Sequence, residues 1–133
     1  MKQSNSSAFA LLVSAWMLLA GGWGLFNPVV LGVVTTNLGQ AIACLVLGVA
    51  GLVARRKANV LHMHLCFFGS LLIMVAVLWV LPATRNLPVD ILDMNGAGAL
   101  LNFVIGAASL VVAVIEASHR RVVPLRATPR ENK

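Results

Sequence analysis

The residues best suited to chemistry are His62, His64 and Cys66, which stand close together in the order HMHLC. Imidazole nitrogens and thiolates are ligands that proteins offer to zinc and haem iron. On a helix His62 and Cys66 share a face, whereas His64 points elsewhere. A metal or haem site needs further ligands, and the other apolar segments contain no histidine and one carboxylate, Glu116. We therefore predict no cofactor, and metal or haem binding is the weakest functional hypothesis.

Asn102 and Gln40 are the next candidates, because each is an amide within an otherwise apolar run. An amide in such a run needs a hydrogen-bond partner, which it finds by joining two helices or by lining a path for a polar solute. We expect Asn102 to join helices, with Asn37 and Gln40 as its partners. The alternative is a polar path lined by Gln40 and Asn102, as in a small oligomeric transporter or channel.

Glu116 is the one acidic residue inside an apolar segment, and it lies near the end of that segment. Arg120 follows four residues later, a spacing that favours an ion pair on a helix. We expect this pairing, because a carboxylate that couples transport to protons usually lies deeper in the membrane. The sequence contains no nucleophile–base pair, phosphate-binding loop or zinc motif, so we predict that the protein is not an enzyme.

Composition indicates a membrane protein. Of the 133 residues 59% are hydrophobic and 11% are charged, and the mean hydropathy is +0.91. A soluble domain of this size could not keep so much apolar surface from water, whereas a bilayer accommodates it. The net charge of +6 does not indicate nucleic-acid binding, because the basic residues form short clusters between apolar runs. Cys44 and Cys66 lie inside such runs and are expected to be unreactive thiols.

Four apolar segments are long enough to cross a bilayer as helices. The predicted spans are residues 8–26, 37–54, 60–81 and 95–117, within one transmembrane domain over residues 1–117. The first run resembles a signal peptide but continues to Phe26 without a small-residue cleavage motif, so we expect it to be retained. Residues 83–94 are predicted to be a polar loop, and residues 118–133 a disordered basic tail. The predicted fold class is an all-α integral membrane protein with four transmembrane helices.

Charge asymmetry predicts the orientation. Lys2, the turn Arg55-Arg56-Lys57 and the basic tail lie on one side of the four-span arrangement. The positive-inside rule therefore places both termini in the cytoplasm of a bacterial inner (plasma) membrane. Anionic lipids are the expected partners of Arg55, Arg56, Lys57 and the tail. Other membrane proteins or further copies of the chain are also candidate partners, and nucleic acid is not.

Small and polar residues recur at steps of three and four along the last span, which places them on one helix face. A shorter stripe of the same kind stands 58 residues earlier. We predict that these two faces form helix–helix interfaces, because small residues let helix backbones approach closely in a membrane. The predicted packing residues are Ala41, Cys44, Gly48 and Gly51 in the second span, and Ala99, Asn102, Gly106, Ser109 and Ala113 in the fourth.

The two stripes are part of a longer internal match. An offset of 58 residues aligns residues 37–53 with residues 95–111, with seven identities in seventeen positions. An offset of 56 pairs Trp23 with Trp79 in the preceding spans. This pattern predicts two hairpins that form a parallel repeat, related by a pseudo-twofold axis along the membrane normal.

The first predicted hairpin reads LAGGWGLFNP, then VVLG, then a Gly-rich helix. It resembles the hairpin repeats of small bacterial inner-membrane proteins, notably the SPW-repeat family and the HdeD-type acid-resistance membrane proteins. Phe26-Asn27-Pro28 departs from the Ser-Pro-Trp signature of the first family. The resemblance implies a repeated-hairpin membrane protein and supplies no catalytic residues. From the small-residue stripes, the short loops and the missing catalytic motifs, we expect a non-catalytic accessory, assembly or stress-related membrane component.

Overall fold

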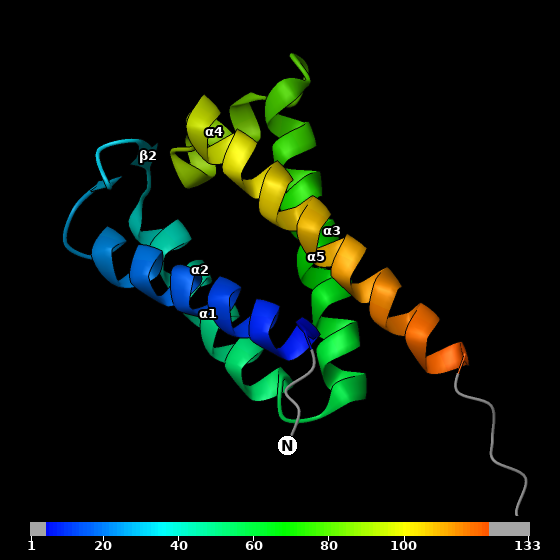
Figure 1. The fold of residues 1–133 in the computed structure, drawn as a ribbon. Helices are drawn as coiled ribbons and strands as arrows, with labels where there is room; N and C mark the ends of the chain where they lie inside the picture. The colour runs from blue at the N-terminus through cyan, green and yellow to red at the C-terminus, as the bar shows by residue number, and fades with distance from the viewer. Residues whose placement is uncertain (1–4, 123–133) are drawn as a thin grey trace, which may run out of the picture.

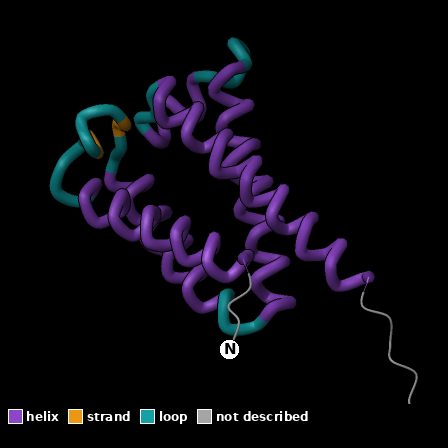
Figure 2. The backbone as a smooth tube through the Cα atoms, viewed as in Figure 1, coloured by secondary structure: helices purple, strands orange, loops and turns teal. Residues whose placement is uncertain are grey.

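The computed structural model describes residues 5–122, and its long helices form two hairpins (Figure 1). Helices α1 (Asn5–Gly24) and α2 (Leu38–Ala54) make the first hairpin, and α3 (Ala58–Val80) and α5 (Gly96–Val122) make the second. Between α1 and α2 lies an antiparallel strand pair, β1 (Val29–Val30) and β2 (Val34–Thr35), and between α3 and α5 lies a short helix, α4 (Asn86–Leu92) (Figure 2). The predominantly helical architecture agrees with the predicted class.

The two ends of the molecule differ. The strand pair and α4 lie at one end, which we call the loop end, and the turn between α2 and α3 lies at the other, which we call the turn end (Figure 1). The first residues of α1 and the last turns of α5 also lie toward the turn end (Figure 1). Residues 1–4 and 123–133, which include Lys2 and most of the predicted basic tail, are outside the described residues.

Among the described residues, three helices are long and apolar enough to cross a membrane: Asn5–Gly24, Ala58–Val80 and Gly96–Ser118. The apolar helix α2 is shorter, with 17 residues. At 1.5 Å per residue it is about 26 Å long, against a hydrocarbon core of about 30 Å. The chain is therefore a membrane protein by the length and composition of three of its helices.

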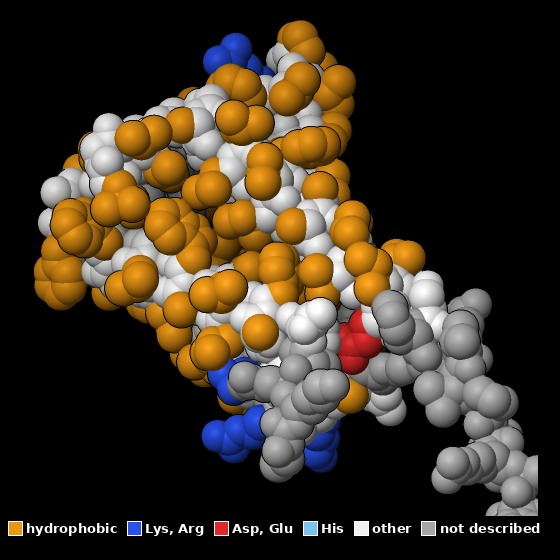
Figure 3. Space-filling model, viewed as in Figure 1, with side chains coloured by type: hydrophobic (Ala, Val, Ile, Leu, Met, Phe, Trp, Pro, Cys, Tyr) orange, Lys and Arg blue, Asp and Glu red, His pale blue; other side chains and the backbone are white. Residues whose placement is uncertain are grey.

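The exposed surface of the helices is mostly apolar. Figure 3 shows hydrophobic side chains along the helices on the viewed face, with Lys and Arg side chains at the two ends. Leu12, Leu19 and Met63 are each 70% exposed. Exposed apolar area of this extent is unfavourable in water by about 25 cal/mol per Å², so these side chains are suited to contact with lipid.

Within each hairpin, helix backbones approach closely at glycine. A β-carbon on Gly69 would lie 2.8 Å from the carbonyl oxygen of Gly106, and a β-carbon on Gly106 would lie 2.8 Å from the carbonyl oxygen of Gly69. In the first hairpin, a β-carbon on Gly21 would lie 2.7 Å from the carbonyl oxygen of Ala41. Real β-carbons do not approach an atom so closely. The close approach of the two helices within each hairpin therefore requires glycine at these positions.

Apolar side chains hold the two hairpins against each other. Buried residues from α1, α3 and α5 form one cluster toward the turn end, and residues from α1 and α3 form a second cluster nearer the middle. The first contains Ala10, Leu61, Leu65 and Ala113, and the second contains Met17, Phe68 and Leu72. Packing between the hairpins is less extensive than packing within them.

The connections differ from the sequence prediction. The polar loop predicted over residues 83–94 contains α4, where Pro88 occupies the first turn and its missing N–H costs no helical hydrogen bond. The apolar connection after α1 contains β1 and β2, whose β-branched residues favour strands. The predicted tail is wrong at its start, because α5 continues as a helix to Val122.

Replacing Gly106 by Leu should destabilise the protein, because its β-carbon would force the backbones of α3 and α5 apart. Overpacking costs about 1–3 kcal/mol, and contact with a carbonyl oxygen places this substitution at the upper end. Thermal unfolding of the purified protein in detergent micelles, followed by circular dichroism, measures the change. Gly22→Leu is the matched control, since a β-carbon there meets no atom within 4 Å. An equal loss in both variants would contradict the importance of the Gly69–Gly106 approach.

Candidate functional site between the two hairpins

One asparagine caps the N-terminus of the second helix in each hairpin: Asn37 precedes α2 and Asn95 precedes α5. The Oδ1 atom of Asn37 accepts a hydrogen bond of 2.9 Å from the backbone N–H of Gln40, and the Oδ1 atom of Asn95 accepts one of 2.8 Å from the N–H of Gly98. Asparagine is among the preferred N-cap residues because its side chain satisfies a backbone N–H that the helix leaves unpaired. The caps orient both carboxamides and leave their Nδ2 atoms available.

Each capping asparagine also bonds to the opposite hairpin. The Nδ2 atom of Asn37 donates to the carbonyl oxygen of Ile91 at 2.6 Å, and the Nδ2 atom of Asn95 donates to the carbonyl oxygen of Val33 at 2.7 Å. Asn95 follows Asn37 by 58 residues, and Ile91 follows Val33 by the same 58. The two bonds are therefore reciprocal: exchanging the hairpins turns one into the other.

A third bond joins the same two connections. The hydroxyl of Thr35 donates to the carbonyl oxygen of Asp93, which again stands 58 residues later. The residues of this bond thus have the same 58-residue separation as Asn37 and Asn95, and as Val33 and Ile91. Asp93 has a φ of 51°, a left-handed conformation that Asp tolerates better than most residues. We refer to these three bonds as the clasp.

A small cavity of about 30 Å³ lies between the hairpins beside the clasp. Its wall includes side chains of α1, the strand connection, α2 and α5. The polar and sulfur-bearing groups on this wall belong to Trp16, Met17, Thr36, Gln40, Cys44 and Asn102. The Oε1 atom of Gln40 is buried and accepts no hydrogen bond from the described residues. The Nδ2 atom of Asn102 donates to the sulfur of Met94 at 3.3 Å.

The structure brings Gln40 and Asn102, the two residues predicted for a polar path, to the same cavity. The predicted hydrogen-bond partners of Asn102 are wrong. Asn37 bonds to Ile91 instead, and Asn102 donates to the thioether of Met94. The sequence prediction overlooked Met94, because it placed this residue at the end of the polar loop, whereas the structure buries it.

Most of the predicted packing residues are buried. Ala41, Gly48, Gly51, Ala99, Gly106, Ser109 and Ala113 are buried, whereas Cys44 and Asn102 are half-buried and line the cavity. The hydroxyl of Ser109 donates to the carbonyl oxygen of Ile105 at 2.8 Å, so this polar group is satisfied within its own helix. The small-residue face of α5 thus packs closely at Gly106 and Ser109 and leaves space at Asn102.

His62, His64 and Cys66 do not form a cluster of metal ligands among the described side chains. The sulfur of Cys66 lies 3.8 Å from Nε2 of His62, on the predicted shared face. The ring of His64 stacks on Phe68, with centroids 5.7 Å apart. Within residues 5–118, no three His, Cys, Asp or Glu side chains are placed to hold a metal ion together. The ion pair predicted for Glu116 involves the side chain of Arg120, which lies outside the described side chains.

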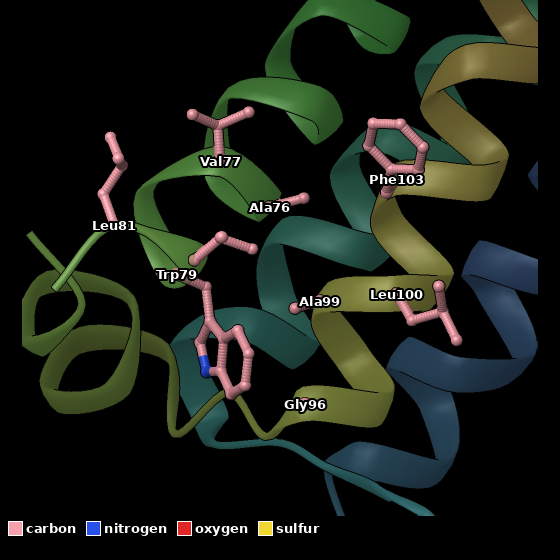
Figure 4. A pocket seen from close by; sticks show the side chains of 9 residues that line it. Ala76, Val77, Trp79, Leu81, Gly96, Ala99, Leu100 and Phe103 are labelled. Carbon is pink, nitrogen blue, oxygen red and sulfur yellow. The ribbon is translucent and has the colours of Figure 1, made fainter.

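A larger groove of about 380 Å³ lies on the outside of the second hairpin, near the loop end (Figure 4). Its lining is apolar: Ala76, Val77, Trp79, Val80, Leu81, Gly96, Ala99, Leu100 and Phe103. The indole N–H of Trp79 donates to the carbonyl oxygen of Met94 at 3.0 Å, and the guanidinium of Arg85 lies 4.4 Å from the ring centroid. The groove offers contact area for a hydrocarbon chain and little hydrogen bonding.

No protein-family model, curated protein or solved structure matches this chain. The site offers hydrogen bonding by the carboxamides of Gln40 and Asn102. It lies beside the clasp, which joins the strand connection to the connection that contains α4.

Asn37→Ala and Asn95→Ala should each destabilise the protein, because each removes a helix cap and a bond between hairpins. A cap contributes about 1 kcal/mol and a hydrogen bond about as much, so we expect a loss of about 2 kcal/mol in each variant. Equilibrium unfolding in mixed micelles measures the free energy of unfolding of each variant.

Asn27→Ala is the control for the clasp, because the Oδ1 atom of Asn27 accepts a bond of 3.0 Å from Val29 N–H within the same connection. We expect a smaller loss there. If Asn27→Ala cost as much as Asn37→Ala or Asn95→Ala, the bonds between hairpins would contribute no more than a local turn contact.

Proposed function

We propose that the protein is a multi-pass protein of the bacterial inner membrane in which α1, α2, α3 and α5 all cross the bilayer and both termini are cytoplasmic. The observation that carries this proposal is that the basic turn and the clasp lie at opposite ends of the molecule. Arg55, Arg56 and Lys57 form the turn end, whereas the clasp joins the uncharged connection and α4 at the loop end. A helix as short as α2 spans when the bilayer thins locally and flanking basic side chains extend to the headgroups.

The two hairpins are proposed to be copies of one parallel repeat. The reciprocal bonds of Asn37 and Asn95 support this relation, since each donates to a carbonyl at matching positions of the opposite hairpin. The bond between Thr35 and Asp93 then lies on the pseudo-twofold axis. A parallel repeat of this kind has its axis along the membrane normal.

The proposed role is non-catalytic: an accessory, assembly or stress-related membrane component. The exposed apolar surface of the helices supports this role, because it favours contact with lipid, other membrane proteins or further copies of the chain. Anionic headgroups are the proposed partners of Arg55, Arg56 and Lys57. The resemblance of the first hairpin to SPW-repeat and HdeD-type proteins supports a repeated-hairpin membrane protein and no particular activity.

Cysteine labelling tests whether α2 crosses the membrane. In a variant lacking Cys44 and Cys66, Phe26→Cys places a thiol beside the strand connection, at a residue that is 91% exposed, and Arg56→Cys places one at the turn end. An impermeant maleimide should label the first in spheroplasts and the second after permeabilisation of the membrane. Labelling of both thiols without permeabilisation would contradict the four-span arrangement.

A second candidate function is a small oligomeric transporter or channel, which the shared cavity of Gln40 and Asn102 favours. The cavity holds about 30 Å³ in this conformation, which is too small for most solutes. We therefore expect proteoliposomes to be no more permeable to small neutral solutes than protein-free liposomes. An increase that Asn102→Leu removes and the outward-facing Phe103→Leu leaves unchanged would favour transport instead.

A further inference from the structure

The groove on the outside of the second hairpin has a floor of small side chains and walls of larger ones. Ala76 of α3 and Ala99 of α5 are buried, whereas Val77 and Phe103 are exposed (Figure 4). The residues of α5 that line the groove span a rise of about 10 Å, so it runs from the loop end toward the middle of the molecule. Its volume of about 380 Å³ falls within the range of ligand pockets, about 300–1,000 Å³.

Trp79 lies at the loop end of the groove. Its indole N–H donates to the carbonyl oxygen of Met94 at 3.0 Å, which holds the ring beside the start of α5 (Figure 4). A β-carbon on Gly96 would lie 3.1 Å from Cη2 of the ring, so the indole packs tightly against the backbone there. A tryptophan with a bonded polar end and an apolar body is typical of the headgroup level of a membrane. The ring therefore marks the boundary between acyl chains and headgroups.

Arg85 places a positive charge at this end of the groove. Its guanidinium lies over the Trp79 ring, 4.4 Å from the centroid, and its backbone N–H donates to the carbonyl oxygen of Leu81 at 2.9 Å. Trp79 and Leu81 both line the groove, so Arg85 contacts its rim at two points. Arg85 is exposed and forms no ion pair with a described residue. Residues 25–37 and 81–95, which include both connections of the loop end, contain no other basic residue.

An apolar groove that ends at an exposed guanidinium suits an amphipathic anion. A guanidinium donates two parallel N–H bonds to a phosphate group, a geometry that an ammonium or a neutral amide does not offer. The groove beside it offers contact area to a hydrocarbon chain and little hydrogen bonding. Anionic phospholipids carry both parts in one molecule, and the bilayer around the helices supplies them.

A membrane-spanning helix fits this groove less well than a lipid. A helix with its side chains is about 10–12 Å across, too wide to enter a groove of this volume, whereas a single acyl chain is narrower. The one acidic residue inside an apolar segment, Glu116, belongs to the turn end. A span of a second copy in the same orientation therefore brings no counter-charge to Arg85.

The first hairpin has the corresponding tryptophan without the charge. Trp23, which the internal match pairs with Trp79, lines a groove of about 540 Å³ formed by α1 and the residues that follow it. The connection after α1, within residues 25–37, contains no charged residue. We therefore expect lipid contact at both tryptophans and a preference for anionic headgroups at Trp79 alone.

We propose that the groove of the second hairpin binds an anionic phospholipid, with one acyl chain along Ala76 and Ala99 and the phosphate group hydrogen-bonded to the guanidinium of Arg85. The site adds a selective contact at the loop end to the headgroup contacts proposed for the basic turn. It rests on the proposed orientation only for the leaflet, which is then the periplasmic one. Binding itself needs only that α3 and α5 lie in the bilayer.

Fluorescence quenching by brominated lipids measures which lipid lies beside Trp79. The chain has three tryptophans, so the full chain with Trp16→Phe and Trp23→Phe reports on Trp79 alone. It is reconstituted into phosphatidylcholine vesicles with a minor fraction of phosphatidylglycerol. Either the phosphatidylglycerol or an equal amount of the phosphatidylcholine carries bromine on its acyl chains. We expect an association constant about fivefold higher for phosphatidylglycerol, the effect of one basic residue near a membrane surface.

Two results of this measurement overturn the proposal. Equal quenching by the two brominated lipids would mean that the groove does not select the headgroup. Little quenching by either lipid would mean that another molecule, such as a second copy of the chain, covers the groove.

Arg85→Gln tests the role of the guanidinium in the protein that reports on Trp79. It should abolish the preference for phosphatidylglycerol while both lipids still quench Trp79. The matched control carries Trp16→Phe and Trp79→Phe, and its Trp23 should be quenched equally by the two lipids. A preference that survives in Arg85→Gln, or that Trp23 shows to the same extent, overturns the site. Circular dichroism of each variant confirms that the helices are retained.

Failure of the four-span arrangement would show in a different measurement, the maleimide labelling of Phe26→Cys and Arg56→Cys. The quenching of Trp79 reports on lipid at the groove whichever side of the membrane the loop end occupies. The two proposals are therefore tested separately.

Discussion

Between α3 and α5 the backbones of Gly69 and Gly106 face each other so closely that neither residue accommodates a side chain. Lipid is as apolar as leucine, so apolar surface alone gives helices in a membrane no reason to associate. Close packing and weak backbone contacts supply the attraction, and both depend on small residues at the point of approach. The same relation recurs in the first hairpin, where Gly21 faces the backbone of Ala41. Each hairpin is thereby a well-packed unit. The arrangement of the whole molecule then depends on the interface between the two hairpins.

The hairpins meet in two different ways along their length. Toward the turn end and the middle, apolar side chains such as Leu65 and Phe68 fill the interface. At the loop end, polar groups join it through the capping asparagines. A hydrogen bond between connections is directional, so it fixes the relative rotation of the hairpins, which apolar packing specifies less sharply. The clasp and the apolar clusters therefore have complementary roles.

The cavity beside the clasp follows from the same arrangement. Gln40, Cys44 and Asn102 line a small cavity between the hairpins, so the interface is loosely packed where these polar side chains gather. Any molecule bound there contacts both hairpins, and its affinity depends on their relative position.

The sequence by itself determined the apolar character of the four long helices and, except at the end of α5, where they begin and end to within a few residues. Both follow from local composition and helical period. The short helix α4 was not predicted. The sequence also identified Asn37 and Asn95 as counterparts, and Gly106 as part of a small-residue face. Only the tertiary structure decided what the asparagines bond to. Ile91 and Val33 contribute backbone carbonyls, which every residue possesses, so no sequence pattern distinguishes them. The partner of Asn102 was decided in the same way, by the fold placing the sulfur of Met94 within its reach.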